Sequence, residues 1–89
     1  MKMIINDCFG GFGVRQEVLD ELELNYFSEE ELRTAARLIE EIENGKDVSD
    51  DCAELKVVEI PDESTDYYLD EYDGLESITY VLNGKLHWA

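Results

Sequence analysis

The chain has 89 residues, 44% of them hydrophobic, and carries 23 acidic against 7 basic side chains, a formal net charge of -16. This length suffices for one small core, so we expect a single domain over residues 1–89. The charge opposes direct binding of nucleic acid or of an anionic membrane, and no apolar run approaches the roughly 18 residues of a membrane span. We therefore expect a soluble, cytoplasmic protein.

A short apolar run at residues 2–6 predicts a buried first strand. A glycine-rich turn follows, in which three glycines within residues 10–13 allow positive φ or a close backbone approach. From residue 14 the apolar residues recur at helical spacing, which predicts a first helix that ends near residue 24 or 25.

A capping-box signal begins the second predicted helix, because Ser28 is followed three residues later by Glu31. Apolar side chains recur at helical spacing as far as Ile42, and Asn44-Gly45 supplies a stop. We therefore predict one continuous helix over residues 28–44. An acidic connection follows at residues 46–53.

The second half of the chain has the character of strands. Residues 55–60 are rich in β-branched side chains and are followed by Pro61, which predicts a strand. Residues 67–72 and 75–82 are two further candidate strands. Asn83-Gly84 predicts a type I′ hairpin to a last strand at residues 85–88. The sequence thus predicts an α+β fold: an N-terminal strand, a glycine-rich turn, two helices, then one mostly antiparallel sheet covered by the helices on one face.

Catalysis and metal binding find little support in the residue types. The two cysteines, Cys8 and Cys52, are expected to stay reduced, although a disulfide is open to them. With His87 as the only histidine, the chain has no zinc-ligand set, and pairing of His87 with Cys8 is unsupported. We expect no enzyme, no catalytic residue, no metal and no cofactor, with at most weak cation binding at Asp70, Glu71, Asp73 and Glu76.

The glycine-rich turn has two interpretations. Backbone amides at a strand-to-helix turn can bind phosphate, but Arg15 is the only nearby cation and neither a Walker nor a G-x-G-x-x-G spacing is present. The structural alternative is a tight turn whose Phe9 and Phe12 fill the core. For a bound phosphorylated nucleotide, the candidate residues are Cys8, Phe9, Gly10, Gly11, Phe12, Gly13, Arg15, Tyr72, Asp73 and Gly74.

Two motifs in the chain, the second of them in two parts, resemble those of a family of small, mostly uncharacterised bacteriophage proteins. Residues 4–13 fit its motif I-x-N-x-C-[FY]-G-G-F-G, and residues 55–62 and 71–74 fit L-K-V-V-E-I-P-D and E-Y-D-G. The family's turn usually continues with Leu-Ser, where this chain has Val14-Arg15, and of its charged ending only His87 and Trp88 remain. The resemblance implies a phage origin, in the cytoplasm of an infected bacterium, and no particular chemistry.

The charge favours a function in binding. A carboxylate surface can occupy the basic groove of a nucleic-acid-binding protein, and small acidic phage proteins often inhibit host or defence proteins in this way. We expect such a non-enzymatic binding protein, with the partner surface at Glu40, Glu41, Glu43, Asp47, Asp50 and Asp51. The alternatives are a solvated face kept for solubility and a nucleotide sponge at the glycine-rich turn; a homo-oligomer is open with either function.

The aromatic residues of the second half are a further candidate site, comprising Tyr67, Tyr68, Tyr72, Tyr80 and Trp88. Such a group can form a stacking platform or a contact patch for a protein. On paired strands, however, aromatic residues more often pack across the sheet or into the core.

Overall fold

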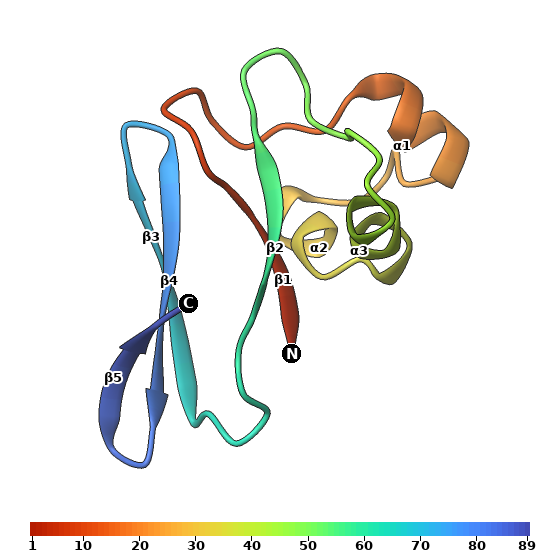
Figure 1. The fold of residues 1–89 in the computed structure, drawn as a ribbon. Coiled ribbons are helices and arrows are strands. Elements are labelled where there is room, and N and C mark those ends of the chain that lie inside the picture. The colour runs from red at the N-terminus through yellow and green to blue at the C-terminus, as the bar shows by residue number, and fades with distance from the viewer.

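The order of elements follows the predicted α+β pattern. The computed structural model describes residues 1–89, with three helices and two antiparallel sheets (Figure 1). The elements are β1 (Lys2–Asn6), α1 (Gln16–Leu22), α2 (Glu29–Arg33), α3 (Ala36–Glu43), β2 (Leu55–Glu59), β3 (Asp66–Tyr72), β4 (Leu75–Leu82) and β5 (Lys85–Trp88). The fold class is confirmed, and all five predicted strands are present.

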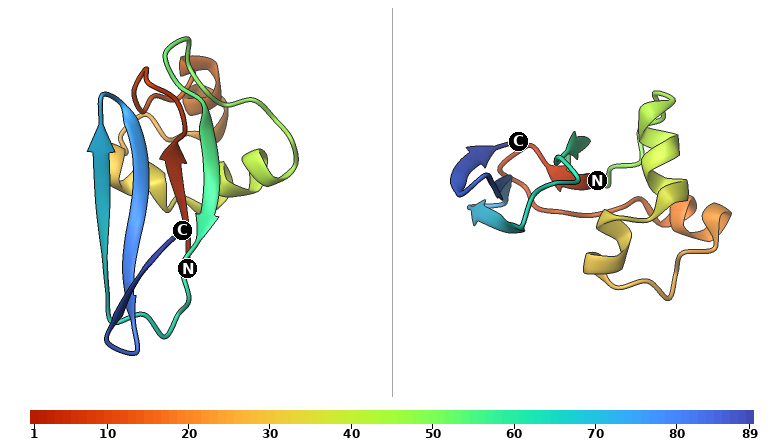
Figure 2. Two further views of the ribbon diagram at one scale, coloured as in Figure 1. Left: turned by 60° about the vertical axis from the view of Figure 1, so that its left-hand side comes forward. Right: turned by 90° about the horizontal axis from the view of Figure 1, so that it is seen from below.

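The strands form two sheets where we expected one. β1 pairs antiparallel with β2, with Ile4 opposite Val57, and β3, β4 and β5 form a separate antiparallel meander. β4 runs beside β1 (Figure 2), but the two are joined there by a side chain, since the amide of Asn6 donates to Oε1 of Glu76 at 2.8 Å. A buried carboxylate thus stands where a backbone ladder would have continued the sheet.

Two apolar cores lie on the two sides of β1, because successive side chains of a strand point to opposite faces. Ile4 packs with Leu38 and Val48 against the helices, while Met3 and Ile5 belong to the second core with Ile78 of β4. The helices therefore cover one face of the β1–β2 ladder, as expected (Figure 2). A fully buried side chain of this size contributes roughly 1.5–3 kcal/mol to stability.

The predicted helix over residues 28–44 is in fact two helices. The capping box at Ser28 is present, with the Ser28 hydroxyl accepting from the Glu31 amide, but the helix breaks after Arg33 and Ala35 adopts an extended ψ of 114°. In one straight helix Arg33 would share its face with Arg37 and Glu40, which are exposed. The break lets Arg33 turn inward while those two residues stay in solvent.

Arg33 turns inward to a buried ion pair. Its two terminal nitrogens donate to the two carboxylate oxygens of Glu76 at 2.8 and 2.7 Å, and its Nη1 also donates to the carbonyl of Ile4 at 3.1 Å. The side chains of Arg33 and Glu76 are only 6% and 5% exposed, and the Phe12 ring lies 4.1 Å from the guanidinium carbon. Burial alone would lower the pKa of Arg33, but bonding and attraction to Glu76 outweigh it and raise that pKa.

The predicted hairpin between β4 and β5 is confirmed. Asn83 and Gly84 both have positive φ, 53° and 74°, as a type I′ turn requires. The register that follows places Tyr80 opposite His87 and Thr79 opposite Trp88. The Tyr80 and His87 rings stack at a centroid separation of 5.3 Å, so His87 takes part in cross-strand packing.

Candidate functional site

Buried Asn6 joins three turns at one end of the molecule. Its Nδ2 donates to the carbonyls of Cys8 at 2.9 Å and Gly74 at 2.7 Å, while its Oδ1 accepts from the amide of Glu54 at 2.7 Å. The glycine-rich turn, the segment before β2 and the β3–β4 turn therefore meet at this residue. The structure thus brings together the two motifs that carry the family resemblance.

Close backbone approach explains two of the glycines in these turns. A Cβ at Gly10 would collide with the carbonyl oxygen of Cys52, and a Cβ at Gly74, whose φ is +89°, would lie 2.8 Å from the carbonyl of Gly10. The Sγ of Cys8 also lies 3.4 Å from the carbonyl oxygen of Cys52. Both cysteines are free thiols. Of the candidate residues, Cys8 and Gly10 thus pack against Cys52, and Gly74 packs against Gly10.

The charges around the glycine-rich turn are mostly negative. Arg15, the cation expected to help hold a phosphate, donates to Asp47 and to the Ser49 carbonyl, both at 3.2 Å. A Cβ at Gly13 would collide with the carboxylate of Asp50, so that carboxylate lies directly against the turn. A phosphate here would have to compete with carboxylates already in place.

The two phenylalanines of the turn differ from each other. Phe12 packs against the helical core, as the structural interpretation requires, and it also stacks on Arg33. Phe9 does not fill the core, and its ring is exposed. A turn held together by Asn6 leaves its tip in solvent, and Phe9 lies at that tip.

The six carboxylates expected to bind a partner lie on α3 and on the connection after it. Three of them pair with cations of the chain: Glu41 with Lys46 at 3.7 Å, Glu43 with Lys2 at 2.7 Å and Asp47 with Arg15 at 3.2 Å. Asp50 accepts from the amide of Cys52 at 2.9 Å and faces the glycine-rich turn. Glu40 and Asp51 are exposed and belong to no ion pair.

A second acidic surface lies on the three-stranded sheet and carries three of the candidate aromatic residues, Tyr68, Tyr72 and Trp88. Every residue of β3 is exposed. Because strand side chains alternate, Asp66, Tyr68, Asp70 and Tyr72 share one face, and the register adds Leu86 and Trp88 of β5 to it. We call these six residues the sheet face. Lys85 and His87 alternate to the opposite side, so no basic side chain lies on it.

Hydrogen bonds hold the two carboxylates of the sheet face in place. The Tyr68 hydroxyl donates to Oδ2 of Asp66 at 2.9 Å, and this bond, together with the nearby charge, raises the pKa of Tyr68. The Thr79 hydroxyl donates to Oδ2 of Asp70 at 2.8 Å. Thr79 is buried between Tyr68 and Trp88, its neighbours across the two ladders. The rings themselves remain open to solvent.

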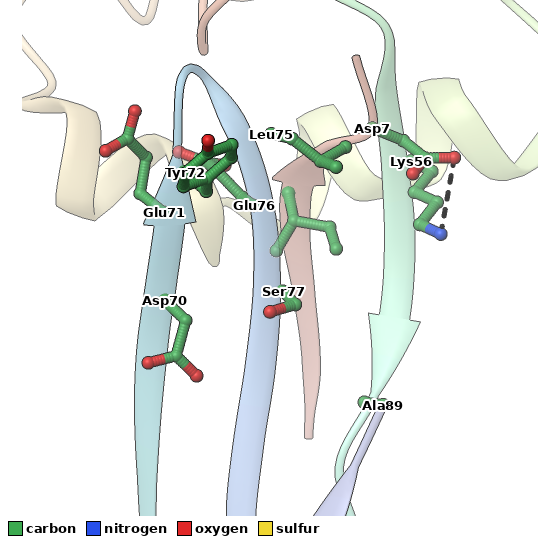
Figure 3. Close-up of a pocket in the computed structure, with 10 residues that line it drawn as sticks. Asp7, Lys56, Asp70, Glu71, Tyr72, Leu75, Glu76, Ser77 and Ala89 are labelled. Atoms are coloured by element: carbon green, nitrogen blue, oxygen red, sulfur yellow. Dashed lines mark ion pairs between the residues drawn. The ribbon is translucent and has the colours of Figure 1, made fainter. Parts of the chain in front are cut away.

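A cleft of about 370 Å³ continues the sheet face toward the β1–β2 ladder (Figure 3). Asp70, Tyr72, Leu75 and Ser77 line it from the β3–β4 side. Ile5 of β1, Asp7 directly after β1 and Lys56 of β2 line the other side. The only cation of the cleft, Lys56, is paired with Asp7 at 3.4 Å. The cleft therefore has the same negative character as the sheet face.

The candidate cation ligands do not gather around one point. Glu76 is occupied by Arg33, Glu71 accepts from the amide of Gly74 at 2.7 Å, and Asp70 accepts from Thr79. No group of three or more His, Cys, Asp or Glu side chains is placed to hold a metal ion. The carboxylates of this region serve the packing of the turns and the sheet.

Comparisons with models of known protein families, with curated proteins and with solved structures find no match to this chain. None of its helices has both the length and the apolar character needed to cross a membrane.

Proposed function

We propose that this protein acts without catalysis, by binding a basic surface of another protein through its own carboxylates. The observation that supports this proposal is the imbalance of pairing: of 23 acidic residues, 8 belong to ion pairs within the chain and 15 do not. Five of the 7 Lys and Arg side chains are used in those pairs. The chain's own cations therefore cannot balance the unpaired carboxylates, and the balancing positive charge has to come from a partner or from salt.

The resemblance to phage proteins supports a particular kind of partner. In an infected bacterium, host and anti-phage defence proteins that bind nucleic acid offer basic grooves built for phosphate. A negative protein surface fits such a groove by electrostatic complementarity, which also speeds association. We propose a partner of this class, for which the acidic protein acts as a mimic of nucleic acid.

The alternative, a phosphorylated nucleotide held at the glycine-rich turn, has less support from the geometry. Arg15 is engaged by Asp47, and the carboxylate of Asp50 lies against Gly13. A bound phosphate gains from unpaired amides and a nearby free cation, and loses where a carboxylate is close.

Native mass spectrometry of the protein purified from infected cells tests the proposal, because it reports a partner and a bound small molecule together. We expect a complex with a basic protein whose dissociation constant rises at least about tenfold between about 50 and 300 mM NaCl, since salt screens exposed charges. A variant in which all six carboxylates of α3 and its following connection are neutralised measures how much of the partner affinity depends on them. These carboxylates are Glu40, Glu41, Glu43, Asp47, Asp50 and Asp51. A partner affinity unaffected by salt, or a bound nucleotide in place of a partner, would contradict the proposal.

A further inference from the structure

The sheet face combines exposed apolar area with fixed negative charge. Tyr72 is 77% exposed, Trp88 70%, Leu86 58% and Tyr68 50%. Tyr68 and Trp88 both lie opposite Thr79 in the register, yet each keeps half or more of its side chain exposed. Large side chains gathered in this way mark an interaction surface more often than single exposed residues do, and Trp and Tyr are frequent at the centre of protein interfaces.

A second copy of this chain does not fit the sheet face. Each copy carries a net charge of -16, and two sheet faces would bring Asp66 and Asp70 of one copy close to the same carboxylates of the other. No basic side chain on the face could offset that repulsion. Like charges brought together in an interface destabilise it, so the occupant has to supply positive charge.

We infer that the sheet face binds an arginine-bearing basic segment of the partner. This inference rests on the proposed function and names the surface and the residue type that it uses. Asp70 is held through Oδ2 by Thr79, which leaves its Oδ1 for an incoming donor. A guanidinium can bind this carboxylate and stack on the neighbouring rings of Tyr68 or Tyr72.

Arginine fits this surface better than lysine does. The planar guanidinium can donate to the free Oδ1 of Asp70 while its flat face lies on an aromatic ring, whereas the lysine ammonium is a compact, strongly hydrated charge. Along β3 the carboxylates and rings alternate, so an extended segment with an arginine at every second position would meet each in turn. The negative cleft beside Asp70 and Tyr72 lengthens the same path.

Trp88 reports directly on the occupancy of the sheet face. It is the only tryptophan of the chain and is 70% exposed. We would titrate the full chain at low salt with a ten-residue peptide of alternating Arg and Ser, and with the Lys-Ser and Glu-Ser peptides as controls. We expect the Arg-Ser peptide to lower acrylamide quenching of Trp88 about twofold or more. The Lys-Ser peptide should bind several-fold more weakly, and the Glu-Ser peptide should not bind.

Matched variants separate the sheet face from the general charge. Tyr68→Ala and Asp70→Asn should each weaken Arg-Ser binding about tenfold, because each removes one of the two kinds of contact. Their controls are Tyr26→Ala, at a ring that is 99% exposed and off the sheet face, and Glu17→Gln, at an exposed carboxylate on α1. The controls should bind within about twofold of the unchanged chain. Circular dichroism and the urea midpoint show whether each variant is folded.

Three results would overturn the inference. They are binding of the Arg-Ser peptide without protection of Trp88, equal weakening by the control variants, and absence of binding at low salt. In each case the proposed function keeps its own test, the salt dependence of the complex formed in infected cells. A salt-dependent native complex that leaves Trp88 exposed would retain the proposed function and reject the sheet face as its site.

Discussion

Removal of one partner from the buried ion pair between Arg33 and Glu76 should be severely destabilising. Both side chains are almost fully buried, and the two oxygens of Glu76 lie 2.7 and 2.8 Å from guanidinium nitrogens. Leaving one charge of such a pair unpaired costs about 3–5 kcal/mol. A domain of this length has about 5–13 kcal/mol of stability in total. Arg33→Met should therefore remove a large part of it.

The double variant distinguishes pairing from packing. In Arg33→Met with Glu76→Leu no buried charge remains, so its cost should fall at least about 2 kcal/mol below the sum of the single variants. The cost will not vanish, because the amide of Asn6 loses its acceptor, a loss of about 1 kcal/mol or more. Glu76→Gln keeps an acceptor for that amide but leaves the buried Arg33 charge without its carboxylate, so we expect it to cost about 3–5 kcal/mol, like the other single variants.

Urea unfolding followed by far-ultraviolet circular dichroism measures these free energies, with the slope checked for constancy between variants. The exposed pair Lys2–Glu43, 2.7 Å apart, is the matched control. Its coupling should be far smaller, because water screens both charges. If the costs of the Arg33 and Glu76 variants simply add to within about 0.5 kcal/mol, the buried pair does not act as a unit and the reasoning fails.

Two further predictions concern the turns and the helix start. Gly10→Ala should lower the free energy of unfolding by several kcal/mol, since the added methyl group would collide with the carbonyl of Cys52. Gly11→Ala meets open space and should cost only about 1–2 kcal/mol, for its positive φ. Similar urea midpoints for the two variants would contradict this. The pKa of Glu31 is lowered by the backbone amide of Ser28, so the stability that Glu31 contributes is complete above its ordinary pKa of 4.5 and is lost as pH falls through the lowered value. Glu31→Gln should therefore lose less stability than the unchanged chain when acidified from about pH 5 to 3, and parallel losses would refute this.

Local signals predicted much of the fold because they depend on near neighbours in the chain. The capping box needs only Ser28 and Glu31, and the type I′ turn needs only Asn83-Gly84. The break after Arg33 depends instead on Glu76, which lies 43 residues away. No short-range pattern distinguishes an arginine that will be buried against a distant carboxylate from one on a solvated helix face, so the sequence favoured a single helix.

The candidate sites show the same limit. The resemblance to the phage family grouped residues 72–74 with the glycine-rich turn. In the structure, Asn6 links the two segments by hydrogen bonds to the carbonyls of Cys8 and Gly74. The carboxylates of α3 were selected from the number of charges alone. A charge count does not show which carboxylates pair with the chain's own cations, as Glu41 and Glu43 do. The sheet face required the register of three strands, although the alternation from Asp66 to Tyr72 was visible in the sequence.

The full exposure of β3 also bears on the behaviour of the protein in concentrated solution. β3 is an outer strand of its sheet, and an open strand edge with apolar side chains invites pairing with other chains. Charged residues on such an edge oppose that pairing. The carboxylates of β3 therefore act as a barrier to aggregation that depends on their ionisation. As the pH approaches the isoelectric point of about 4.1, the net charge of the chain approaches zero and the repulsion between copies weakens, while the tyrosines stay exposed. Acid then favours edge-to-edge assembly of the folded protein.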